Sequence, residues 1–215
     1  MKKILALLLL IISGCSANKA MQPAHINDET DSFVEFTDDK ALSANLIPLR
    51  QKALTPGTKE IRVWVGFGVV SREDLLVLQI DRDGSVTGQK IWVYKIEPEK
   101  WKDEPEALEE YLDGIYYRCN VISKYQNIES CKVKNSEIYD WSKVYSKLLN
   151  LDIWTLPDES KLPKPEVVVL HGFSVVVELN DGINYRAYSY GNPGFRKDEE
   201  AEKASKMMSF VKSLY

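Results

Sequence analysis

His171 and Ser174 come nearest in this chain to the pattern of a nucleophilic hydrolase. A serine beside a histidine base, with a third group to orient the base, activates a hydroxyl for acyl transfer. Ser174 follows His171 by three residues, but no third partner is indicated and the chain contains no G-x-S-x-G motif. We therefore predict no catalytic residue and expect His171 to lie in a turn that opens a strand.

The other polar motifs indicate neither a metal site nor a cofactor site. Residues 81–84 (Asp-Arg-Asp-Gly) begin like a calcium loop but lack the downstream glutamate that would complete it. Residues 66–68 (Gly-Phe-Gly) lack the third glycine and the following helix of a dinucleotide site. Glu178 is predicted to lie on an exposed strand face, as a solvated charge. We expect the protein to need no cofactor and no metal.

The N-terminus has the order of an export signal. Lys2 and Lys3 precede an apolar run of nine residues, 4–12, a length typical of a signal peptide. At about 1.5 Å per helical residue this run is too short to cross a hydrocarbon core about 30 Å thick. Residues 12–15 (Ile-Ser-Gly-Cys) follow, and this segment resembles the lipobox of bacterial lipoproteins.

The resemblance implies that Cys15 is lipidated. Cleavage would fall between Gly14 and Cys15, the thiol would carry a diacylglycerol, and the new amino group would often be acylated as well. Two or three acyl chains give stable anchoring. Ser16, where an aspartate favours the inner membrane, favours the outer membrane of a Gram-negative host. The alternative is an ordinary cleaved signal in which Cys15 has no anchoring role.

The two remaining cysteines, Cys119 and Cys131, are predicted to form a disulfide. An exported chain meets an oxidising compartment, and the pair lacks the C-x-x-C spacing of a redox or metal site. The disulfide would close a loop of about a dozen residues, and in the chain-entropy model closing such a loop stabilises the fold by a little under ~3 kcal/mol.

The rest of the chain is predicted to form a tether, residues 15–58, and a single α+β domain, residues 59–215. A short docked element is expected within the tether, over residues 42–54. Hydrophobic periodicity and turn residues predict a mostly antiparallel sheet packed with two main helices. The expected strands are 61–70, 75–80 and 86–95, joined as a meander through a turn at Gly84. A hairpin (or a short helix) over 115–134, a helix over 136–150, a hairpin over 173–190 and a helix over 197–214 follow.

The 173–190 hairpin allows a register to be predicted. A three-residue turn would place Val177 opposite Tyr185, keeping one face apolar, whereas a two-residue Asp181-Gly182 turn would place Val177 opposite Arg186. We predict the first register, with Gly182 in the left-handed conformation of a G1 bulge.

Arg186, Tyr188 and Tyr190 share one strand of this hairpin, with Tyr188 and Tyr190 on the face away from the predicted core. Aromatic rings beside an arginine suit recognition of a protein or a glycan, so the three residues form a candidate binding surface. The alternative is that a helix covers this face and the rings belong to the core. Residues 185–193 also resemble the tail of uncharacterised bacterial envelope lipoproteins, a resemblance that implies no activity.

The charge of the chain excludes one class of partner. Its formal net charge is −4 and becomes −6 without Lys2 and Lys3, whereas a nucleic-acid-binding protein needs a basic face. We expect a protein attached to the membrane by its lipid, with a non-catalytic role in binding a protein or an envelope component. The alternatives are an envelope hydrolase acting on cell-wall or glycan material, and an inhibitor that docks through an aromatic edge.

Overall fold

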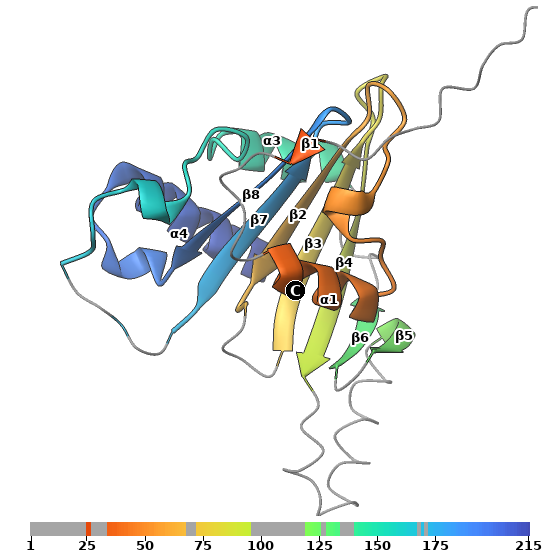
Figure 1. Ribbon diagram of the computed structural model, residues 1–215, viewed down its shortest axis with the longest axis horizontal. Helices are drawn as coiled ribbons and strands as arrows, with labels where there is room; N and C mark the ends of the chain where they lie inside the picture. The colour runs from red at the N-terminus through yellow and green to blue at the C-terminus, as the bar shows by residue number, and fades with distance from the viewer. Residues whose placement is uncertain are drawn as a thin grey trace, which may run out of the picture.

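The fold is organised around one β-sheet (Figure 1). The computed structural model describes residues 25–26, 34–67, 72–95, 119–125, 128–133, 140–166, 169 and 172–215. Within these residues eight strands lie in the order β1-β8-β7-β2-β3-β4-β6-β5. Neighbours are antiparallel except β1 and β8, which are parallel. The strands are β1 His25–Ile26, β2 Lys59–Val65, β3 Arg72–Ile80, β4 Val86–Lys95, β5 Cys119–Tyr125, β6 Ile128–Val133, β7 Ser174–Asn180 and β8 Asn184–Gly191.

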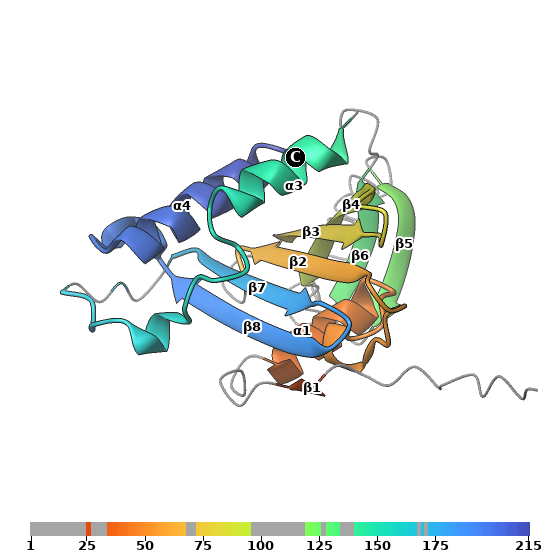
Figure 2. The ribbon, with the colours of Figure 1, turned by 90° about the horizontal axis from the view of Figure 1, so that it is seen from above.

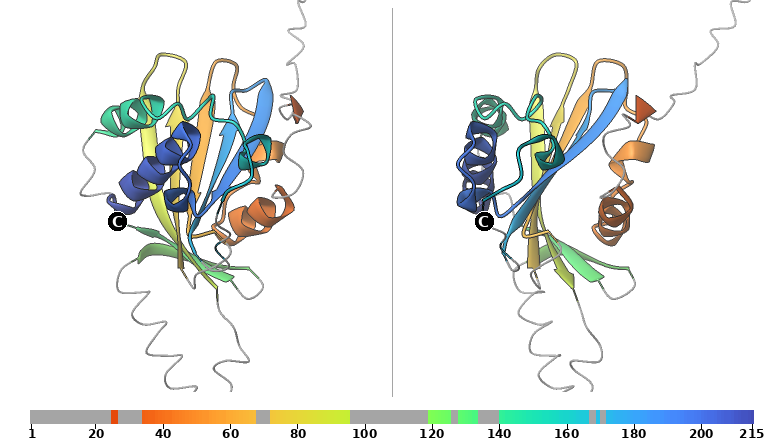
Figure 3. Two further views of the ribbon diagram at one scale, coloured as in Figure 1. Left: turned by 90° about the vertical axis from the view of Figure 1, so that its left-hand side faces the viewer. Right: turned by 60° about the vertical axis from the view of Figure 1, so that its left-hand side comes forward.

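Helices cover both faces of this sheet. Helices α3 (Trp141–Leu149) and α4 (Glu199–Lys212) lie on one face, and α1 (Val34–Ser43) lies on the other (Figures 2 and 3). This arrangement confirms the predicted α+β class, the antiparallel meander and the two main helices. Short 3-10 turns lie in the loops: η1 Leu49–Gln51, η3 Glu159–Lys161 and η4 Pro193–Phe195. Among the described helices none is long and apolar enough to cross a membrane.

The central strands are buried on both sides. In β2, Val63 and Val65 pack into the core under α3 and α4, while Trp64 between them points to the α1 side, where it packs with Leu75. Successive residues of a strand point to opposite faces. A strand covered on both faces therefore shows no alternation of polar and apolar residues, and this property recurs in β7.

Both main helices begin at an aspartate cap. Asp140 accepts a hydrogen bond from the Lys143 amide at 3.2 Å, and Asp198 accepts one from the Ala201 amide at 2.9 Å. A carboxylate in this position satisfies an amide that has no partner within the helix. The described helices are shorter than the predicted 136–150 and 197–214, and residues 136–139 lie outside the described residues.

Small residues on α4 bring it close to the sheet. Ala201 and Ala204 are fully buried together with Met207 and Val211, and the four residues form the apolar stripe of the helix. Two i,i+4 ion pairs form on the outer face. Lys203 lies 2.6 Å from Glu199, and Lys206 lies 2.6 Å from Glu202.

The β7–β8 hairpin forms, but the predicted register is wrong. Val177 lies opposite Tyr188, and Asn180 lies opposite Tyr185. The Asp181 amide bonds to the Asn184 carbonyl, so the connection is Gly182-Ile183 rather than a three-residue turn. Both faces of β7 are buried, so the requirement for one apolar face did not decide the register. Gly182 does have the predicted positive φ, +86°.

Replacing Gly182 by valine should destabilise the protein more than the same change at Gly84. Both glycines have positive φ, +86° and +84°, which costs about 1–2 kcal/mol for an L-residue with a side chain. A Cβ at Gly182 would also lie 3.2 Å from the Thr58 carbonyl oxygen, whereas a Cβ at Gly84 would meet nothing within 4 Å. Urea unfolding of the two variants measures the difference. An equal loss at both positions would contradict the steric contribution.

The predicted tether is wrong for residues 34–58, which belong to the folded domain. Ala41 and Leu49 are fully buried, and Asn180 of β7 donates to the carbonyl oxygens of Leu49 (3.1 Å) and Lys52 (3.0 Å). The physical reason is that the sheet has a second apolar face, and residues 34–58 cover it and exclude water. The short docked element expected over 42–54 is present as part of this covering layer.

Strands β5 and β6 form the predicted hairpin that carries the two cysteines. Cys119 lies opposite Val133 and Cys131 lies opposite Ile122, with a register shift between Cys119 and Val121. The cysteines are therefore diagonal neighbours rather than direct partners. Diagonal Cα atoms are typically about 7–8 Å apart, longer than the usual disulfide span of about 4.4–6.8 Å. The disulfide remains a prediction.

Candidate functional site

The predicted surface of Arg186, Tyr188 and Tyr190 is not a surface. The tyrosines are 2% and 0% exposed, and their hydroxyls donate to the carbonyl oxygens of Ile153 (2.8 Å) and Pro157 (2.7 Å). The Arg186 guanidinium also donates to carbonyl oxygens of the segment after α3. Burial raises the pKa of both phenols. The alternative prediction, that the rings belong to the core, is confirmed.

A cluster of buried polar side chains lies on the opposite face, under α1. Its centre is Glu178, fully buried although the sequence predicted an exposed position. Its carboxylate accepts hydrogen bonds from Trp64 Nε1 (2.7 Å) and the Tyr185 hydroxyl (2.9 Å). Burial raises the pKa of Glu178, an effect that the Arg62 guanidinium and a hydrogen bond with Thr37 of α1 oppose. We call these residues together the Glu178 cluster: Glu178, Trp64, Tyr185, Arg62, Thr37 and Glu60.

Arg62 connects the Glu178 cluster to the N-terminal layer. Its Nε donates to Glu60 Oε1 at 2.9 Å, and its Nη2 donates to the Ile47 carbonyl oxygen at 2.8 Å. Lys52 completes an ion pair with Glu60. Buried charges remain tolerable when they are paired and hydrogen-bonded. Because the central side chains are shielded from solvent, we assign the cluster a structural role, that of fixing residues 34–58 to the sheet.

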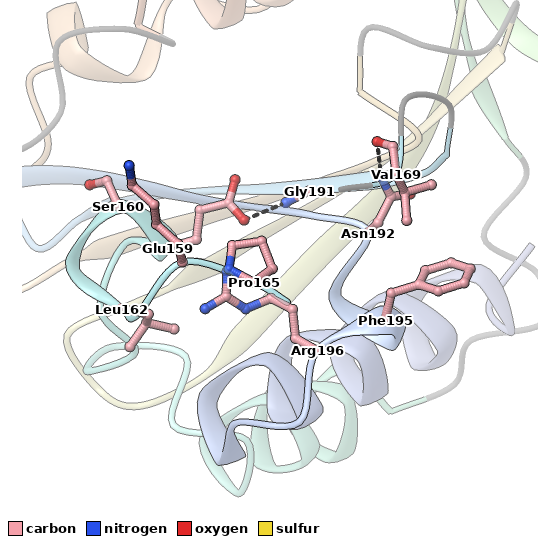
Figure 4. A pocket seen from close by; sticks show the side chains of 10 residues that line it. Glu159, Ser160, Leu162, Pro165, Val169, Gly191, Asn192, Phe195 and Arg196 are labelled. Carbon is pink, nitrogen blue, oxygen red and sulfur yellow. Dashed lines mark hydrogen bonds between the residues drawn. The ribbon is translucent and has the colours of Figure 1, made fainter. Parts of the chain in front are cut away.

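An open cleft lies at the far end of β8, between η3 with its following loop and η4 (Figure 4). Its volume is about 470 Å³, within the usual range of ligand sites. We call it the η3–η4 cleft. Its lining residues are Glu159, Ser160, Leu162, Lys164, Pro165, Val169, Gly191, Asn192, Phe195 and Arg196.

Two carboxylates fix η3 against the edge of β8. Asp158 Oδ2 accepts a hydrogen bond from the Ser189 amide at 2.8 Å, and Glu159 Oε2 accepts one from the Gly191 amide at 2.9 Å. Figure 4 shows the Glu159 side chain directed along the cleft toward Gly191. Partial burial raises the pKa of Glu159, while the Gly191 amide opposes the shift. The carboxylates thus satisfy strand-edge amides that β7 does not reach.

Arg196 and Asn192 hold the other walls. Arg196 donates through Nε to Asp198 Oδ2 and through Nη2 to the Pro163 carbonyl oxygen, both at 2.8 Å. Asn192 has a φ of +50° at the start of η4, and its Nδ2 lies 3.4 Å from the Val169 carbonyl oxygen. The Arg196–Pro163 and Asn192–Val169 bonds join segments 33 and 23 residues apart in sequence, so the walls of the cleft are fixed without a ligand.

Apolar groups line the cleft between these polar positions. Leu162 and Val169 are partly buried, Pro165 is exposed, and the Phe195 ring is 65% exposed. In Figure 4 Phe195 lies at the end of the cleft away from Glu159. An exposed ring beside a preformed cleft is a typical anchor for a partner.

The described groups in the cleft do not form a nucleophile–base pair. Ser174 donates its hydroxyl to the Phe67 carbonyl oxygen at 2.6 Å, which gives it a structural role. His171 and Cys15 lie outside the described residues. No group of three or more histidine, cysteine, aspartate or glutamate side chains in the described residues could hold a metal ion. The chemistry that the cleft offers is recognition through one carboxylate and an apolar wall.

Sequence reasoning missed this cleft because its walls come from loops. Residues 159–169 and 191–196 carry no hydrophobic periodicity. The contact between these two loops, which are far apart in sequence, leaves no pattern in either segment alone. The only local signal is the Asn192-Pro193-Gly194 turn, which indicates a loop but no ligand.

Comparison with known proteins adds no family. No family model matches the chain, and no curated protein matches it.

Proposed function

We propose that this protein is a lipid-anchored component of the bacterial cell envelope whose domain binds a partner protein or envelope component in the η3–η4 cleft, without catalysis. The support for its location is the order of Lys2 and Lys3, the apolar run and Cys15. The lipid would hold the domain close to the membrane, in reach of other envelope components.

The observation that carries the binding proposal is the preformed cleft with Phe195 exposed at its mouth. The hydrogen bonds of Glu159, Asn192 and Arg196 fix its walls in advance. Preformed walls reduce the ordering cost of association, so a small contact can still bind specifically.

Phe195→Ser should abolish capture of the partner. The tagged full-length protein would be purified from envelopes of its host in mild detergent and its stoichiometric partners identified. Loss of an aromatic anchor costs about 2 kcal/mol or more, which is about a thirtyfold loss of affinity. Ile183→Ser is the matched control, because Ile183 is 73% exposed in the β7–β8 turn and lies outside the cleft lining.

The proposal predicts that wild type and Ile183→Ser recover the same partner and that Phe195→Ser loses it. Equal recovery by all three proteins would contradict a binding role for the cleft. Turnover of cell-wall or glycan substrates that is lost in the cleft variant would instead establish the hydrolase alternative.

A further inference from the structure

Among the described residues that line the η3–η4 cleft, Glu159 is the only acidic one, and its hydrogen bonding is incomplete. Oε2 accepts the Gly191 amide at 2.9 Å, and within the described part of the chain Oε1 has no hydrogen-bond partner and no cation forms an ion pair with the carboxylate. An ionised carboxylate offers about four acceptor positions. Glu159 therefore retains free acceptor capacity inside a partly desolvated cleft.

The cation whose charge acts on Glu159 does not fill that capacity. The positive charge of Arg196 favours the ionised form of Glu159. Its Nε and Nη2, however, donate hydrogen bonds to Asp198 and to the Pro163 carbonyl oxygen. Asp158 and Asp198 add negative charge around Glu159. Lys164, also in the lining, has an exposed side chain. The surroundings of Glu159 thus favour a further positive charge.

The remainder of the cleft suits an alkyl stem. In Figure 4 Pro165 lies between Glu159 and Phe195, and Leu162 lies below Glu159; all of them line the cleft. Long cationic side chains bury their methylene groups on apolar surface while the charged head group reaches a polar partner. Hydrogen bonds between two ionised groups are also stronger than neutral ones.

We propose that the η3–η4 cleft recognises a lysine or arginine side chain of a partner protein, with its charged head group on Glu159 and its stem against Leu162, Pro165 and Phe195. The inference rests on the proposed binding function and gives the chemistry of the ligand. Charge complementarity selects a cationic group over a neutral or acidic one, and the apolar wall selects an extended side chain over a small ion.

Titration of the ¹⁵N-labelled protein with blocked amino acids tests this proposal. The probes are N-acetyl-lysine methylamide, N-acetyl-arginine methylamide and the uncharged N-acetyl-norleucine methylamide. The Gly191 amide, which bonds to Glu159, is the reporter. Both cationic probes should shift its resonance saturably, with affinity at least tenfold above that of the norleucine probe.

Glu159→Gln provides a second, independent measurement. Glutamine keeps an acceptor for the Gly191 amide and removes the charge, so affinity for the cationic probes should fall at least tenfold. Glu166→Gln is the matched control, since Glu166 lies in the same loop but outside the cleft lining, where it is exposed and pairs with Lys197 at 2.9 Å. This variant should bind like the wild type.

Two results would overturn the inference. Equal binding of the norleucine probe would make the cleft an apolar site, and unchanged binding by Glu159→Gln would place the cation elsewhere. If the cationic probes fail to bind while Phe195→Ser still abolishes partner capture, the cationic specificity is wrong and the binding function stands. If Phe195→Ser leaves capture intact, the proposed function fails on its own experiment.

Discussion

Replacing Glu178 by leucine is expected to lower the free energy of unfolding by about 3–5 kcal/mol, the usual cost of breaking a buried charged network on one side. The change leaves Trp64 Nε1 and the Tyr185 hydroxyl without the acceptor that now lies 2.7 Å and 2.9 Å from them. It also removes a negative charge that faces the buried Arg62. Urea unfolding measured by tryptophan fluorescence gives the free energy directly.

Glu178→Gln separates the hydrogen bonds from the charge. The amide oxygen keeps an acceptor in place, so the loss should be smaller than that of the leucine variant. Glu202→Leu, on the exposed face of α4, controls for removal of a carboxylate and should change stability little. A leucine variant as stable as the wild type would show that the Glu178 cluster does not fix the N-terminal layer.

The pH dependence of Glu178 has a definite sign. Its pKa is raised in the folded state above the ordinary value of 4.5, so the folded state holds the proton more tightly than the unfolded state. The stabilising contribution is complete below about pH 4.5 and declines as the pH rises through the raised folded pKa. The stability of the wild type relative to Glu178→Gln should therefore fall as the pH rises above about 4.5. A difference that grows with pH would contradict the raised pKa.

Cys15→Ser should remove the protein from the membrane fraction without unfolding it. The variant cannot form the thioether that carries the diacylglycerol, and each methylene buried in the bilayer contributes about 0.8 kcal/mol to anchoring. Incorporation of labelled palmitate and sedimentation after a carbonate wash measure the effect. The described fold begins at β1 (His25–Ile26), which lies after Cys15 in the chain, so the unfolding midpoint should not change.

The chain provides matched controls for this experiment. Cys119→Ser and Cys131→Ser remove a thiol from β5 or β6, and both variants should keep the palmitate label and the membrane attachment. If Cys15→Ser still carries the label or still sediments with washed membranes, the anchor lies elsewhere in the chain.

Local signals in the sequence were sufficient for much of the fold. Residues 61–65 and 75–80 are rich in β-branched and aliphatic side chains, Gly84 lies in the predicted turn, and Gly182 adopts the positive φ predicted for it. The stripe on α4 follows directly from helical periodicity. These features depend on residues close together in the chain, because secondary-structure propensity and turn geometry are determined by neighbouring residues.

The functional residues were less predictable. Tyr188 and Tyr190 were expected on a surface and lie in the core, with Arg186 partly buried beside them, whereas Glu178 was expected in solvent and is buried. Alternation along β8 indicates two faces, but it does not indicate what covers each one. The segments that cover them, residues 34–58 on one side and 150–158 on the other, are distant in sequence.

By itself the sequence determined the α+β class, the positions of the main strands and helices, and the order of residues that resembles a lipobox at Cys15. Tertiary structure alone decided the register of β7 against β8, the burial of Glu178 with Arg62, and the cleft that joins Glu159 to Gly191 and Arg196. The physical reason is that the alternation of polar and apolar residues along a strand indicates which residues are buried only when one face of the sheet is exposed to water. Here helices cover both faces, and the cleft arises where separate loops meet.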